Sequence, residues 1–107
     1  MDPFTTPLHK FTLPTTLTTD KIDSFRITYA QEPRMGARPV AVLTKTKEDC
    51  TIYGNIITTY LSQAETNKFQ RNKPAQVQIH LKTTEGQVMQ SRVIHLCVHD
   101  SLDTKEL

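Results

Sequence analysis

The sequence predicts an all-β fold built from antiparallel strands. Polar and apolar residues alternate along several short stretches, which is typical of strands with one exposed and one buried face. Threonine is abundant, and β-branched residues suit such half-buried strands. The stretches are separated by turn signals and do not alternate with long helices. We therefore expect an antiparallel β-sandwich of immunoglobulin-like type with one short connecting helix.

The central element of this sandwich is a hairpin between residues 75 and 99. Its turn is expected at 84–87, where Gly86 can adopt a positive φ without steric cost. The apolar positions of its two strands are Val77, Ile79 and Leu81, then Ile94, Leu96 and Val98. One side of this hairpin therefore needs cover from the rest of the chain.

The remaining segments provide that cover. The further strands are expected at residues 9–13, 24–31, 40–46, 50–53 and 55–61. Tyr29 is expected on a buried face together with Phe25 and Ile27. Ser62 and Glu65 have the spacing of a capping box, which predicts a helix of about two turns that ends near Phe69. Ala64 and Phe69 are expected to attach this helix to the sheet.

The length of 107 residues suits one domain with one small core. Residues 9–100 are expected to form this domain. Residues 1–8, with two prolines and few anchoring side chains, are expected to form an extended arm, and residues 101–107 a polar tail.

Composition argues against several classes of partner. The net charge of +2 and the scattered basic residues do not predict nucleic-acid binding. The sequence has no run of about 18 apolar residues to cross a membrane. Its N-terminus lacks the features of a secretory signal, so we expect Cys50 and Cys97 to be free thiols in a reducing cytosol.

A metal site is the most specific alternative. His95, Cys97 and His99 alternate along one strand and so share a face, and His80 on the partner strand is a fourth donor. Successive residues on one face are roughly 6 to 7 Å apart, however, and three ligands in a line rarely converge on one ion. We therefore expect neither a metal nor another cofactor.

Catalytic motifs are lacking as well. A cysteine nucleophile needs a general base and an orienting group, and the sequence offers no glycine-rich loop beside either cysteine. Three glycines are too few for a phosphate-cradling loop. We therefore do not expect an enzyme.

Most of residues 9–99 resemble a family of small β-sandwich proteins of tailed bacteriophages and prophages of Firmicutes. The matching segments are FTLP at 11–14, IDSFRITYAQ at 22–31, KTKEDCTIYGNIIT at 45–58, LSQAETNKF at 61–69, VQIHLKTTEG at 77–86 and SRVIHLCV at 91–98. The resemblance implies a virion protein similar to the N-terminal domains of baseplate or fibre-adaptor proteins. Its partners would be other virion proteins or further copies of itself, after synthesis in the host bacterial cytoplasm. The sequence departs from the family in its arm, which lacks an Arg-Gly pair before the first Thr-Pro, and in its long loop at 32–39.

We therefore expect a non-enzymatic structural or adaptor component of a virion tail, neck or capsid. Contacts are expected through an edge strand, the arm and the loop. The expected contact residues are Phe4, Leu8, Phe11, Arg34, Met35 and Arg38. The alternative is a receptor- or glycan-binding module that recognises the host surface, with Tyr53 and Tyr60 facing the ligand.

Overall fold

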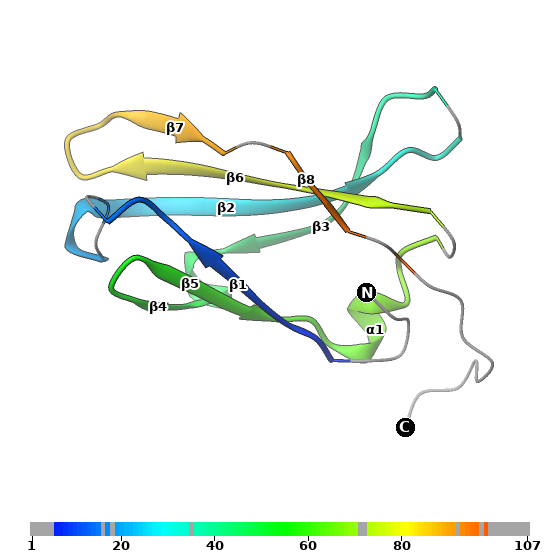
Figure 1. Ribbon diagram of the computed structural model, residues 1–107, viewed down its shortest axis with the longest axis horizontal. Helices are drawn as coiled ribbons and strands as arrows, with labels where there is room; N and C mark the ends of the chain where they lie inside the picture. The colour runs from blue at the N-terminus through cyan, green and yellow to red at the C-terminus, as the bar shows by residue number, and fades with distance from the viewer. Residues whose placement is uncertain are drawn as a thin grey trace.

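Two antiparallel sheets form the molecule, as the computed structural model shows (Figure 1). The structure describes residues 6–15, 17, 19–34, 36–70, 73–91, 93–96 and 98. The elements in chain order are β1 (Leu8–Thr12), the 3₁₀ turn η1 (Thr19–Lys21), β2 (Ile22–Gln31), β3 (Val40–Thr46), the 3₁₀ turn η2 (Lys47–Asp49), β4 (Thr51–Tyr53), β5 (Ile56–Tyr60), α1 (Gln63–Thr66), β6 (Ala75–Thr83), β7 (Val88–Gln90) and β8 (Ile94–Leu96). The smaller sheet has the order β1-β5-β4, and the larger has the order β3-β2-β6-β7, with β8 also paired to β6. The predicted all-β sandwich is thus confirmed.

The pairing of β2 with β6 forms the centre of the larger sheet. Ile27 lies opposite Ile79, and Tyr29 lies opposite Val77. These side chains are buried, whereas the polar residues between them point to the other face. The period-two alternation predicted for both strands is therefore confirmed.

The return strand of the central hairpin differs from the prediction. It begins at Val88 rather than near Ile94, and it is divided into β7 and β8, which pair with different parts of β6. Ser91 lies at the break. Its backbone N–H donates to the carbonyl of Ile79 (2.8 Å), and its hydroxyl oxygen accepts from the Ile79 N–H (2.9 Å). A side-chain oxygen thus replaces a backbone acceptor, and the Ser91 carbonyl accepts from the Gln78 side chain instead (3.0 Å).

The smaller sheet has three antiparallel strands with β5 in the middle, and β1 is distant in sequence from the β4–β5 hairpin that it joins. Gly54 has a φ of 60° in the turn between β4 and β5, as the sequence predicts for a tight hairpin. Leu8, which we had assigned to the arm, is the first residue of β1 and lies opposite Tyr60. The strand β1 is an edge strand of this sheet, as predicted.

The helix α1 is shorter than predicted. It has four residues rather than two turns, and Ala64 is exposed instead of packing on the sheet. The predicted capping box is present: the Ser62 hydroxyl accepts from the Glu65 N–H (3.2 Å), and the Glu65 carboxylate accepts from the Ser62 N–H (2.9 Å). A salt bridge of 2.7 Å from Lys45 of β3 to the same carboxylate attaches the helix to the larger sheet.

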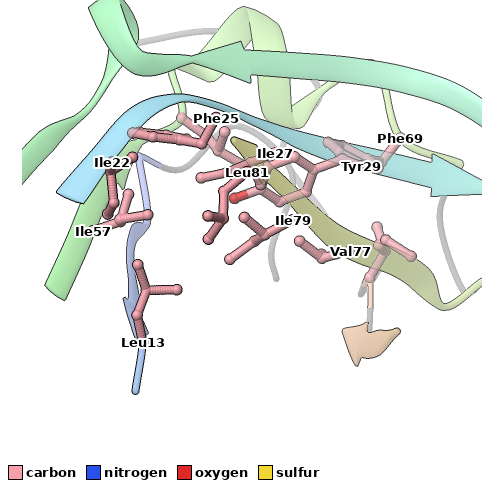
Figure 2. Close-up of a cluster of buried hydrophobic side chains, with 13 residues drawn as sticks. Leu13, Ile22, Phe25, Ile27, Tyr29, Ile57, Phe69, Val77, Ile79 and Leu81 are labelled. Atoms are coloured by element: carbon pink, nitrogen blue, oxygen red, sulfur yellow. The ribbon is translucent and has the colours of Figure 1, made fainter. Parts of the chain in front are cut away.

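The core lies between the two sheets and draws on both (Figure 2). Its buried hydrophobic residues are Leu13, Ile22, Phe25, Ile27, Tyr29, Ile57, Leu61, Phe69, Ala75, Val77, Ile79, Leu81 and Val98. Phe69, which follows α1, packs edge-on against the Tyr29 ring with 6.0 Å between ring centroids. The expectation that Phe69 anchors this segment is therefore confirmed.

Candidate interaction surfaces

The outward face of the smaller sheet carries three exposed large hydrophobic side chains, Leu8, Tyr53 and Tyr60. We call it the tyrosine face, and it consists of Leu8, Lys10, Thr12, Thr51, Tyr53, Ile56, Thr58 and Tyr60. Alternate residues of the same strands, such as Ile57 and Thr59, are buried against the core. Strand alternation therefore projects the members of this set away from the molecule.

Two aromatic positions lie at opposite ends of the tyrosine face. The side chains of Tyr53 and Tyr60 are 85% and 64% exposed. Tyr53 lies opposite Ile56, and Tyr60 lies opposite Leu8, which is 41% exposed. Tyr60 is four residues beyond Ile56 on β5, so the two aromatic ends are about 13 Å apart along the strand. The face therefore presents two aromatic–aliphatic pairs with a polar strip between them.

The other predicted contact residues are distributed differently. Phe11 is partly buried and packs against the hydrophobic core, on the opposite face of β1 from Leu8. Arg34 and Arg38 are exposed in the loop between β2 and β3, where the Ala37 N–H donates to the Arg34 carbonyl (3.0 Å). Phe4 and Met35 lie outside the described residues.

Behind the tyrosine face, His9 of β1 contacts Tyr29 of β2 across the sandwich. The two rings stack with 5.6 Å between centroids, and the Tyr29 hydroxyl is 2.6 Å from Nδ1 of His9. Burial lowers the pKa of His9 below its usual value and raises the pKa of Tyr29 above its usual range. Both groups are therefore neutral at pH 7, and a hydrogen bond joins the hydroxyl oxygen to Nδ1 of the imidazole. This contact fixes the edge strand β1, which carries three of the eight residues of the tyrosine face.

The structure does not bring the candidate metal ligands together. His95 lies opposite Gln76, four residues along β6 from His80, and the row of Gln78 separates the two histidines. Cys97 and His99 lie outside the described residues. Within the described part of the chain, no group of three or more histidine, cysteine, aspartate or glutamate side chains is arranged to hold a metal ion.

Cys50 is a free thiol beside the core. Partial burial raises the pKa of Cys50. A raised pKa keeps the thiol protonated at neutral pH, which is the unreactive form. The geometry thus gives no support for a nucleophilic role of this cysteine.

Ile56, an apolar member of the tyrosine face, was not among the residues singled out from the sequence. Ile56 joins Tyr53 because the two-residue turn at Gly54 and Asn55 sets these residues opposite each other. The signal was present in the sequence, since a two-residue hairpin loop fixes the register of the strands that it joins. The partner of Tyr60 carries no such signal, because β1 is far away in the chain.

Neither the family models, nor the curated proteins, nor the solved structures that were compared with this chain include a match. Among the described residues, no helix has the length and apolar character required to cross a membrane.

Proposed function

We propose that this protein is a non-enzymatic structural component that assembles through protein–protein contacts in the particle of a tailed bacteriophage. The tyrosine face is the contact surface in this proposal. The particle is proposed from the sequence resemblance, and the mode of assembly is proposed from the exposed surface.

The observation that carries the proposal is the exposure of Tyr53 and Tyr60 on one face of a small sheet. Tyrosine is enriched at protein interfaces because its ring buries a large apolar area while its hydroxyl remains hydrogen-bonded. Leu8 and Ile56 extend the apolar area beside each ring. A partner that covers this face would remove three of the exposed large hydrophobic side chains, Leu8, Tyr53 and Tyr60, from water.

The edge strand β1 supports the same mode of assembly. It pairs with β5 on one side and with no described strand on its other side. An edge strand offers backbone donors and acceptors to a strand of a neighbouring chain. Leu8 lies on this strand and also on the tyrosine face, so one neighbour can engage both features.

Glycan binding at the host surface is the second candidate function. It is favoured by the same pair of tyrosines, because exposed aromatic rings stack on sugar rings. The separation of about 13 Å along the strand suits an oligosaccharide that spans both ends of the face rather than a single sugar. In this case soluble cell-wall fragments would bind the isolated protein, and Tyr53→Ser would weaken the binding.

The proposed contact surface is tested by supplying tagged variants in trans to an infected or induced culture and purifying the particles. We expect the wild type and Val88→Ser to co-purify with particles and Tyr53→Ser/Tyr60→Ser to be lost. Val88 is a matched control because it is an exposed apolar residue on the other sheet. Retention of the double variant at the wild-type level would contradict the proposed contact surface.

A further inference from the structure

The outward face of the larger sheet carries three nitrogen-bearing side chains at adjacent positions. Arg26 of β2 lies opposite His80 of β6, and Lys82 is two residues further along β6. Side chains directly opposed on a sheet are about 5 Å apart at Cβ, and diagonal neighbours are about 7–8 Å apart. The guanidinium, the imidazole and the ammonium group are therefore close enough to contact one small ligand.

An open hollow of about 440 Å³ lies over these three residues. Two of the other charged groups in its lining have partners already. Lys47 donates to the carbonyls of Ile22 (3.4 Å) and Asp23 (3.3 Å), and the Glu48 carboxylate accepts from the Thr46 hydroxyl (2.9 Å). Asp23 lies at the same rim, so the lining has both signs of charge with the cations in excess.

The three central groups lack partners in the described part of the chain. No ion pair or hydrogen bond joins the Arg26 or Lys82 side chain to a described residue. Nδ1 of His80 is buried and has no hydrogen-bond partner there. The hollow therefore presents two cationic side chains, Arg26 and Lys82, that no described residue neutralises.

We propose that this hollow binds a phosphate group. Arg26 would contact two of its oxygens through the guanidinium fork, and Lys82 would neutralise the remaining charge. His80, between them in the register, would supply a further ring N–H. The phosphate is carried either by a small phosphomonoester or by a phosphodiester polymer, since both present the same oxygens. This site lies on the opposite sheet from the tyrosine face and does not depend on the proposed function.

Amide chemical shifts of the full chain, titrated with inorganic phosphate, test the proposal. We expect saturable shifts centred on residues 24–26 and 80–82. Arg26→Gln/Lys82→Gln should weaken binding at least about tenfold, whereas Arg38→Gln/Lys68→Gln should bind as the wild type does. The second variant removes the same two charge types from exposed positions elsewhere. If the first double variant does not fold, His80→Gln provides a further variant. Glutamine is uncharged, as a neutral imidazole is.

Parallel titrations with glycerol phosphate and with a short single-stranded oligonucleotide distinguish the two sources of the phosphate. Tighter binding of glycerol phosphate indicates a small phosphomonoester, and tighter binding of the oligonucleotide indicates a phosphodiester polymer. Three results would overturn the proposal. One is a failure of all three probes to shift residues 24–26 and 80–82. Another is equal weakening in both double variants, which would show diffuse attraction to surface charge. The third is saturable shifts confined to another face.

Discussion

The Tyr29 hydroxyl lies 2.6 Å from Nδ1 of His9, and this contact joins the two sheets of the sandwich. Each residue belongs to a different sheet, with His9 on the edge strand β1 and Tyr29 on the central strand β2. The tyrosine side chain is fully buried. The contact therefore couples the position of β1, and with it the tyrosine face, to the core.

Removal of the hydroxyl should destabilise the fold while the ring packing is preserved. We expect Tyr29→Phe to lower the free energy of unfolding by about 1 kcal/mol, because a half-buried imidazole nitrogen loses its hydrogen-bond partner. Urea unfolding measures the change. Tyr53→Phe is the control, since its hydroxyl is exposed and its loss should change stability by less than about 0.5 kcal/mol. Equal stability of Tyr29→Phe and the wild type would show that the hydrogen bond contributes nothing.

His9 should make stability depend on pH in the range below its ordinary pKa. Burial lowers the pKa of His9 in the folded protein, so the unfolded chain binds the proton more readily. Its contribution is fully present above about pH 6.5 and is lost as the pH falls from there through the folded pKa, with a slope of at most about 1.4 kcal/mol per pH unit.

Urea unfolding between pH 7.5 and 5 measures this slope. His9→Phe should flatten it, whereas His95→Gln, at an exposed position, should leave it unchanged. An undiminished slope in His9→Phe would assign the pH dependence to another group.

The pairing of Lys45 with Glu65 should stabilise the junction between α1 and the larger sheet. The ammonium group is 2.7 Å from the carboxylate, and both side chains are mostly buried. Burial alone would raise the pKa of Glu65, but the hydrogen bonds from Lys45 and the Ser62 backbone lower it overall. The stabilisation should therefore hold above about pH 4.5 and be lost as the pH falls through the lowered folded pKa.

A double-mutant cycle with Lys45→Met and Glu65→Gln isolates this pair. We expect a coupling energy of about 1 kcal/mol at pH 7, between the values typical of exposed and buried pairs. The coupling should weaken as the pH falls below about 4.5 and the carboxylate becomes protonated. A coupling near zero at pH 7 would mean that the capping box alone retains the helix.

Gln31 should stabilise the segment that leads from α1 to β6. Its buried side-chain amide donates to the carbonyls of Gln70 (3.0 Å) and Lys73 (3.3 Å), and its oxygen accepts from the Gln70 N–H (2.6 Å). Gln31→Ala leaves these backbone groups without partners, so we expect a loss of about 2 kcal/mol. Thermal unfolding measures it, with Gln90→Ala as an exposed control. A loss as small as that of the control would show that water replaces the side chain at no cost.

Local patterns predicted the strands well, because alternation depends only on which side chains a strand buries. Tyr29 and Ile79 were placed on buried faces from their neighbours in sequence alone, and both are buried. The division of the return strand was not predicted, since it depends on the Ser91 hydroxyl replacing a backbone acceptor opposite Ile79. The length of α1 was overestimated because a capping box marks where a helix begins and says little about where it ends.

The candidate sites show the same division between local and long-range information. Tyr53 and Tyr60 were singled out as the tyrosines that remain once Tyr29 is assigned to a buried face, but their common face follows from the pairing of β5 with both β4 and β1. The metal hypothesis counted His80 and His95 as neighbours, whereas the register separates them by two rows of β6. Register between strands distant in the chain is set by the whole core, and a single segment does not reveal it.

The central claim, that the protein is a structural part of a virion, is tested most directly by quantitative mass spectrometry of purified particles from an induced or infected culture. We expect the untagged protein in the particles at a stoichiometry comparable to that of tail or capsid proteins. Its abundance in the cell lysate together with its absence from the particles would contradict the claim.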